Sequence, residues 1–251
     1  MKRVAPPTHV QLEVTTTCNL RCVHCGLNQA NYEHRTLSWE SFEKVVPFLT
    51  RYRPSVDLSG HGESLVCSRF LRMFRRTIEA GCRVSFFTNA TLLTPKTSEQ
   101  LLEHAGPDGF HAVTVSLDAA EPMLFETIRR GASFDVFVNN LRALDQKKRQ
   151  RGLRHPKVAF NAVAMLLNLA QIPAMVRLAK DLGGEEIVVV DLLEYEFWRN
   201  QRLANDPEAA RKALGDAQDV AREVGITLTI TPELRTLISA DGRAPAGRAR
   251  P

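Results

Sequence analysis

Short runs of β-branched and aliphatic residues alternate along the chain with longer segments whose apolar residues recur at helical spacing. In the first helical segment Phe42 and Leu49 lie on one face, and Ser38 can cap the helix start. The strands that this pattern predicts are 9–14, 55–59, 83–88, 112–117, 157–163, 186–191 and 226–230. The predicted helices are 38–50, 68–80, 96–105, 121–147 with a break near Gly131, 169–182 and 206–224.

Regular alternation of strands and helices predicts an α/β fold with a parallel sheet and right-handed crossovers. Six clear strand–helix units are too few for a closed eight-unit barrel, so we expect an open, partial (β/α)6 TIM-like barrel. We assign this core to residues 1–195. A helix and a strand in 196–232 form a short C-terminal extension, and the Gly/Pro/Arg-rich segment 233–251 is expected to be a flexible tail.

The cysteines give the clearest chemical signal. Cys18, Cys22 and Cys25 lie within eight residues, directly after the first predicted strand. Iron–sulfur clusters are held by closely spaced Cys thiolates, and a four-iron cluster takes four ligands. Because the loop supplies three, either a distant cysteine completes the set or one iron binds something that is not protein. The other two, Cys67 and Cys82, stand alone, which is typical of core residues.

Other uses of these cysteines fit less well. A disulfide framework is disfavoured because the cysteine count is odd and the N-terminus has no apolar signal-peptide core, so we expect a cytoplasmic protein. A structural zinc site would need a fourth ligand, and His24, adjacent to Cys25, is a poor candidate.

Hydropathy and charge argue against two further classes, membrane proteins and nucleic-acid-binding proteins. No apolar run approaches the roughly 18 residues of a membrane span, so we expect no membrane association. The net charge of +5 is mild, and much of it lies in 147–151 and in the tail. A solvated helix end and a flexible tail account for it, which disfavours nucleic acid as a partner.

Polar, glycine-containing segments follow the second, third and fourth predicted strands, at 59–65, 88–93 and 116–118. In open parallel sheets ligands bind beyond the carboxyl ends of the strands, so these segments should converge on one rim. Gly60 and Gly62 would let the backbone approach a small zwitterion closely. An ordinary glycine-rich turn explains this loop, taken alone, equally well.

The spacing C-x-x-x-C-x-x-C of Cys18, Cys22 and Cys25 resembles the signature of the radical S-adenosylmethionine (SAM) superfamily, and the resemblance spans roughly residues 8–195. It implies that the three thiolates hold one [4Fe–4S] cluster whose fourth iron is chelated by SAM. It further implies reductive cleavage of SAM to a 5′-deoxyadenosyl radical, which abstracts hydrogen from a peptide or small-metabolite substrate. The electron would come from a donor such as flavodoxin or ferredoxin.

Several segments are similar to the peptide-modifying branch that carries a SPASM or twitch extension. The family's Gly-Gly-Glu-Pro motif, which receives the SAM ammonium, is similar to His61-Gly62-Glu63-Ser64, where the bulky His61 must either crowd the SAM site or turn away. The segment 128–131 is similar to Ile-Arg-Gly-Gly, which implies that Arg129 faces the SAM carboxylate. The other SAM contacts that the resemblance implies are Gly60, Thr88, Asn89, Ser116, Asp118, Asn161 and Leu192.

The sequence departs from the family pattern after Cys82 and at His61 and Ser64, and these departures keep other functions open. No cysteine follows Cys82, whereas this branch usually binds auxiliary clusters there, so we expect a single cluster. Cys67, close behind the Gly62-Glu63 loop, is a candidate hydrogen-atom donor or cluster ligand besides a passive core residue. An iron–sulfur electron carrier would need a fourth thiolate from Cys67 or Cys82. A degenerate, non-catalytic SAM-binding module is the other alternative, because of His61 and Ser64.

Overall fold

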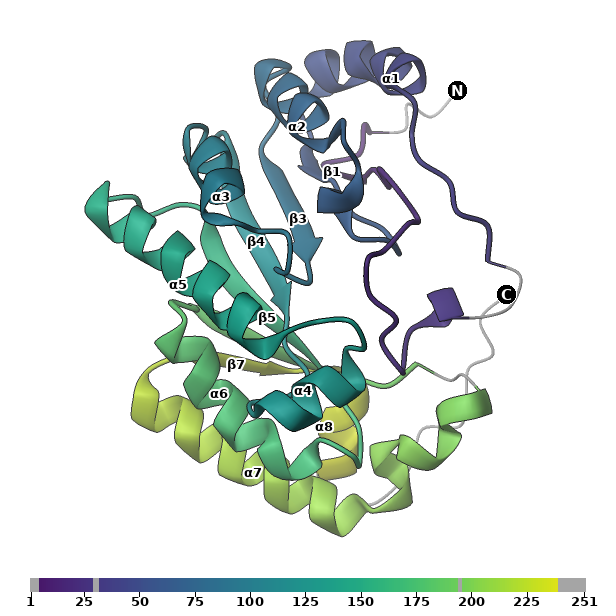
Figure 1. The fold of residues 1–251 in the computed structure, drawn as a ribbon, viewed down its shortest axis with the longest axis vertical. Coiled ribbons are helices and arrows are strands. Elements are labelled where there is room, and N and C mark those ends of the chain that lie inside the picture. Colours follow the sequence, from purple (N-terminus) through teal and green to yellow (C-terminus); the bar gives the residue numbers. More distant parts are fainter. Residues whose placement is uncertain (1–4, 29–31, 194–195, 239–251) are drawn as a thin grey trace.

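The computed structural model describes residues 5–28, 32–193 and 196–238. Its centre is one sheet of seven parallel strands in the order β1-β2-β3-β4-β5-β6-β7, open at both edges (Figure 1). This confirms the α/β fold and the partial, TIM-like barrel. The strands are β1 His9–Gln11, β2 Ser55–Asp57, β3 Val84–Thr88, β4 Phe110–Ser116, β5 Lys157–Ala164, β6 Glu186–Asp191 and β7 Thr227–Ile230.

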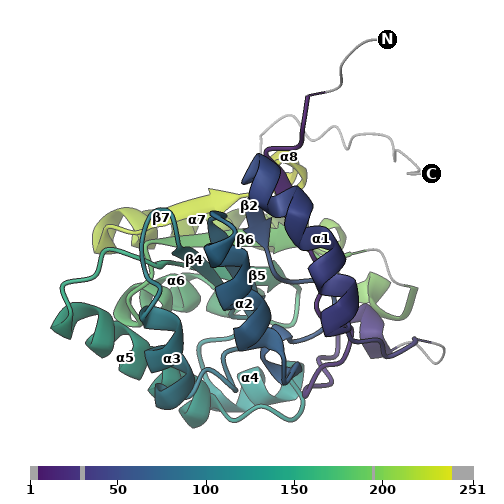
Figure 2. The same cartoon turned by 90° about the horizontal axis from the view of Figure 1, so that it is seen from above.

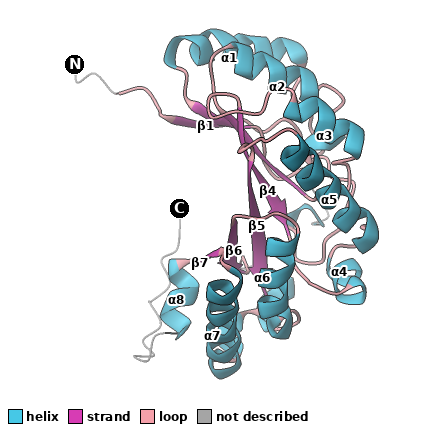
Figure 3. Cartoon of the chain, turned by 90° about the vertical axis from the view of Figure 1, so that its left-hand side faces the viewer, coloured by secondary structure: helices cyan, strands magenta, loops and turns pink. Residues whose placement is uncertain are grey.

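Helices follow the strands and cover the outer side of the curved sheet, as Figure 3 shows edge-on. The longer helices are α1 Trp39–Tyr52, α2 Phe70–Glu79, α3 Pro95–Leu102, α4 Pro122–Ile128, α5 Phe134–Gln150, α6 Ile172–Asp181, α7 Pro207–Val224 and α8 Pro232–Ile238. Short 3-10 helices are η1 Gly26–Asn28, η2 Ser64–Val66, η3 Leu169–Gln171, η4 Glu196–Gln201 and η5 Leu203–Asn205. None of the helices within the described ranges combines the length and apolarity that a membrane crossing requires.

The two faces of the sheet differ sharply on β3. Phe86 is fully buried and packs on the helix side against Phe74 and Phe110, with ring centroids 6.5 and 5.4 Å away. Successive strand residues point to opposite faces, so the adjacent Phe87, 43% exposed, lies on the inner, concave face. The hydrophobic core therefore lies between sheet and helices, and the inner face stays open.

Local signals set the element ends much as predicted. The Ser38 hydroxyl accepts a hydrogen bond from the Ser41 N–H at the start of α1. The expected break near Gly131 separates α4 from α5, and Gly131 has a φ of +94°, a conformation that glycine adopts without strain. β1 ends three residues early, because beyond Leu12 the chain pairs with another segment: Leu37 N–H donates to Val14 O.

The C-terminal segment departs from the sequence prediction. The strand expected in the extension, β7, pairs with β6 and so continues the core sheet. Residues 233–238, which the sequence analysis assigned to the tail, belong to helix α8 in the structure. The physical reason for this helix is Leu234, which is fully buried and packs α8 against the core. The rest of the predicted tail lies outside the described residues.

Candidate functional site

The cysteine loop begins beyond the carboxyl end of β1 and is held from two sides. On one side, Glu63 N–H donates to Thr17 O at 3.0 Å, which joins the loop to the segment that follows β2. On the other side, Arg21 N–H donates to Arg130 O at 2.9 Å and Val23 N–H to Ile128 O at 2.8 Å. The three cysteines thus lie on a backbone clamped between the β2 loop and the end of α4.

The cysteine sulfurs face hydrogen-bond donors. Cys18 Sγ accepts from Leu20 N–H at 3.4 Å and lies 3.9 Å from Asn89 Nδ2, while Cys22 Sγ lies 3.9 Å from Arg129 Nη1. Burial raises the pKa of Cys22 to about 11, against the opposing charge of Arg129. Coordination by iron would displace that thiol proton, because metal ligands bind as thiolates.

This donor set fits an iron–sulfur cluster. Cys18, Cys22 and Cys25 are half-buried cysteines that form no disulfide, and hydrogen bonds to the sulfurs are among the contacts that tune such clusters. No three His, Cys, Asp or Glu side chains within the described ranges converge on a position for one metal ion. A cluster spreads its thiolates over several irons, so it does not require that convergence.

The two isolated cysteines are both buried in the hydrophobic core. Cys67 is 6% exposed and belongs to the hydrophobic core behind η2. Cys82 is fully buried, lies 3.7 Å from Leu49 O, and precedes β3, at the end of the sheet opposite the cysteine loop. The placement of Cys82 leaves Cys67 as the thiol that a four-thiolate carrier would need.

The glycines of the β2 loop have a structural purpose that the sequence did not reveal. A Cβ on Gly62 would lie 2.4 Å from Thr15 O and 2.5 Å from Thr17 O, so only glycine lets this loop pack on the cysteine loop. A Cβ on Gly60 would lie 2.0 Å from Glu13 Oε1. The sequence analysis expected these glycines to let the backbone approach a ligand. In the structure they let the β2 loop approach other segments of the protein's own chain.

Glu63 ties the β2 loop to the end of β3. Its side chain is 3% exposed: Oε1 accepts from Thr88 Oγ1 at 2.9 Å and from Leu65 N–H at 3.2 Å, and Oε2 accepts from Asn89 N–H at 2.6 Å. Burial raises the pKa of Glu63, and these hydrogen bonds act in the opposite direction. Thr88 and Asn89 thus hold Glu63, and the Asn89 side chain also reaches Cys18.

A buried charge pair lies beside the cysteine loop. Arg129 Nη2 is 2.6 Å from Asp118 Oδ2, and the two residues are 5% and 0% exposed. Asp118 Oδ1 accepts from Val163 N–H at 2.9 Å, and His24 Nε2 lies 3.6 Å from Oδ2. Burial lowers the pKa of both His24 and Arg129, but for Arg129 the Asp118 carboxylate outweighs it and the net shift is upward.

The surroundings of this pair bear on whether the site can bind the carboxylate of SAM. Arg129 Nε is buried and has no hydrogen-bond partner among the described residues, which leaves a donor for a ligand carboxylate. Asp118, by contrast, is fully buried and its carboxylate is engaged by the protein. The expected SAM contact of Asp118 stays a prediction that this geometry does not favour.

The remaining predicted contacts lie on neighbouring strands. Ser116 ends β4 and pairs in register with Asn161, which lies within β5, and both are half-buried. Leu192, directly after β6, is 3% exposed and packs in the core. The structure therefore gathers Ser116 and Asn161 at the site, and it places Leu192 in the core beside it.

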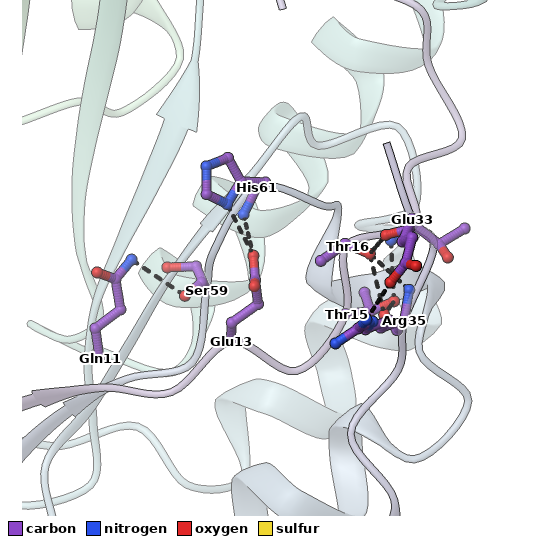
Figure 4. A network of polar contacts seen from close by, with 9 residues as sticks. Gln11, Glu13, Thr15, Thr16, Glu33, Arg35, Ser59 and His61 are labelled. Carbon is purple, nitrogen blue, oxygen red and sulfur yellow. Dashed lines mark hydrogen bonds and ion pairs between the residues drawn. The ribbon is translucent and has the colours of Figure 1, made fainter. Parts of the chain in front are cut away.

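His61 lies against Glu13, two residues beyond the end of β1, as Figure 4 shows. Its N–H donates to Glu13 Oε1 at 2.6 Å, its Nδ1 lies 3.2 Å from the same atom, and its side chain is 65% exposed. The Tyr32 ring lies 5.8 Å away. The sequence analysis did not identify Glu13. The available signal was its polar side chain two residues after Gln11, since residues two apart on a strand point to the same face.

We expect His61→Gly to leave SAM affinity within tenfold of wild type, about 1.4 kcal/mol, because the ring lies against Glu13 and glycine keeps the N–H that Glu13 accepts. Isothermal titration of SAM into the reconstituted protein under anaerobic conditions measures this. Glu13→Gln, which keeps the shape and removes the charge, is the matched variant. A larger loss of affinity in His61→Gly would show that the imidazole is a SAM contact.

The chain is similar to several known proteins. The model of the Radical SAM superfamily matches residues 12–179. The chain is 26% identical over 188 residues to a tungsten-containing aldehyde ferredoxin oxidoreductase cofactor-modifying protein of Pyrococcus furiosus, covering 74% of this chain and 51% of the relative. It is 28% identical over 178 residues to mycofactocin maturase MftC of Mycolicibacterium smegmatis, covering 71% and 43%. The chain thus spans about half the length of these relatives.

Among solved structures, Streptococcus suis SuiB bound to precursor peptide SuiA superimposes with a TM-score of 0.71. The match covers 92% of this chain and 50% of SuiB at 18% sequence identity. At this identity the likeness establishes the shared fold alone.

Proposed function

Because the chain belongs to the radical SAM superfamily, we propose that it is a SAM-cleaving enzyme whose Cys18, Cys22 and Cys25 bind one [4Fe–4S] cluster. The family implies the cluster and SAM. The observation that carries the proposal is the clamped loop of three half-buried cysteines beside a buried arginine whose Nε has no hydrogen-bond partner among the described residues. When bound, the cluster supplies the electron that cleaves SAM to a 5′-deoxyadenosyl radical able to abstract a substrate hydrogen.

The chain's own residues bind and orient the cofactor. Arg129 directs its free Nε to the SAM carboxylate, and the backbone of Gly60–Glu63 receives the ammonium group. Glu63, held by Thr88 and Asn89, fixes that backbone against the cysteine loop. The polar side chains Ser116 and Asn161 face the nucleoside, and Leu192 packs behind the adenine from the core.

The substrate we propose is a peptide or a small metabolite that enters along the inner face of the sheet. This face is open and mixed in character: Phe87 is 43% exposed there, and the neighbouring Ser85 hydroxyl donates to Asp57 at 3.2 Å. The names of two similar proteins, a maturase and an enzyme solved with its precursor peptide, support a peptide. Five cysteines that form no disulfide support a reducing compartment such as the cytoplasm.

Anaerobic reconstitution tests the function directly. We expect about four irons per chain and, with dithionite, slow conversion of SAM to methionine and 5′-deoxyadenosine without substrate. Iron is measured by a colorimetric assay after removal of loosely bound metal, and the nucleoside by liquid chromatography. Iron near twice that value would contradict the single cluster, and absence of 5′-deoxyadenosine would contradict SAM cleavage.

A further inference from the structure

A groove of about 510 Å³ lies on the helix side of the sheet, between α1 and α2. The two helices run side by side at one edge of the molecule, as Figure 2 shows from above. The groove is lined by Trp39, Glu43, Ser68, Leu71, Arg72, Arg75, Arg76, Glu79 and Gln100.

Positive charge is concentrated along α2. Arg69, Arg72, Arg75 and Arg76 recur at spacings of three and four, so they neighbour one another on the helix surface. Arg76 pairs with acidic neighbours on α1 and α2. Within the described part of the chain, Arg69, Arg72 and Arg75 form no ion pair, which leaves three uncompensated guanidinium groups on this surface.

The centre of the surface is a stacked Trp–Arg pair. The Arg72 guanidinium lies 3.7 Å from the centroid of the Trp39 ring, which holds the charge in a fixed position. The Trp39 ring also packs against Phe42, with centroids 5.3 Å apart, so the pair rests on the core. Trp and Arg are the side chains most enriched where protein interfaces concentrate their binding energy.

One end of the groove, at Trp39 and Ser68, lies toward the end of the sheet where the cysteine loop lies. Trp39 is two residues from Leu37, whose N–H donates to Val14 O at 2.9 Å, four residues before Cys18. Ser68 is five residues from Glu63, whose N–H donates to Thr17 O next to Cys18. The reach of an extended chain bounds both separations from Cys18 at roughly 25 Å.

From these observations, and resting on the proposed function, we infer that this α1–α2 surface docks an acidic one-electron carrier protein. One electron leaves the carrier's reduced centre and is taken up by the cluster, so the carrier is oxidised by one electron and the cluster reduced by one. Complementary charge steers and orients such encounters, and redox partners bury little area, so a small basic surface suffices.

The double variant Arg69→Glu/Arg75→Glu tests the docking, because it reverses charge and leaves the Trp39–Arg72 stack intact. Stopped-flow absorbance follows reduction of the reconstituted cluster by reduced flavodoxin. We expect the rate at low salt to fall at least tenfold and to lose the salt dependence seen in the wild type. The matched control, Arg142→Glu/Arg154→Glu, reverses two exposed arginines on α5 and in the loop before β5 and should keep the wild-type rate.

A second reductant separates this inference from the proposed function. With dithionite, which needs no docking, both double variants should form 5′-deoxyadenosine at the wild-type rate. Equal flavodoxin rates in the two double variants would overturn the docking surface alone. A second outcome would also overturn the docking surface. In it, a labelled single-stranded oligonucleotide binds the wild type but not Arg69→Glu/Arg75→Glu, while flavodoxin reduces the cluster of both proteins at the same rate. Wild-type protein that is inert with dithionite would overturn the proposed function, and the docking inference with it.

Discussion

We expect Cys18→Ala, Cys22→Ala and Cys25→Ala each to abolish both cluster binding and SAM cleavage. A site with three protein ligands has none to spare, and all three thiols lie on one loop with no other cysteine placed to replace them within the described residues. Iron content, the visible absorbance of the reconstituted protein and 5′-deoxyadenosine formation measure the effect. Activity should fall to background, since no uncatalysed route to the radical exists.

The core cysteines supply the control. Cys67→Ala and Cys82→Ala remove thiols of the hydrophobic core, so they should lower the unfolding temperature slightly and leave four irons per chain. Loss of the cluster in either variant would favour an electron carrier with four thiolate ligands. Loss of SAM cleavage with an intact cluster in Cys67→Ala would instead support Cys67 as a hydrogen-atom donor.

A second large effect is expected at the buried pair beside the cysteine loop. Asp118→Asn leaves the Arg129 guanidinium buried without a countercharge, and breaking a buried pair in this way costs about 3–5 kcal/mol. We expect urea unfolding of the reconstituted protein, followed by circular dichroism under anaerobic conditions, to show a loss of this size. SAM affinity should fall as well, because Asp118 holds the guanidinium that is proposed to meet the SAM carboxylate.

A double-mutant cycle separates the pair from general damage. If Asp118 acts through Arg129, then Asp118→Asn/Arg129→Gln should cost less than the two single losses added together. Arg177→Gln is the control: it breaks a bidentate pair with Glu223 on the exposed surface and should leave the urea midpoint nearly unchanged. Additive losses in the cycle, or an Asp118→Asn variant as stable as the control, would contradict the role of Asp118 as the partner of Arg129.

The sequence by itself determined the family, the order of strands and helices and the cysteine loop. These features rest on local spacing: three cysteines in eight residues, apolar residues with strand or helix periodicity, and Ser38 and Gly131 at element ends. A parallel sheet brings the segments after its strands to one rim whatever their detailed contacts, so the rim was predictable as well.

Only the tertiary structure decided which groups those residues meet. Glu13 with His61, Asp118 with Arg129 and Glu63 with Asn89 are pairs separated by 26 or more residues, or by 11 in the case of Asp118, and no local pattern encodes them. The same is true of Gly62, whose missing Cβ admits the cysteine loop, and of the seventh strand, which joins the core sheet through β6. Such contacts depend on how the backbone folds in space and on which polar groups burial forces to find a partner.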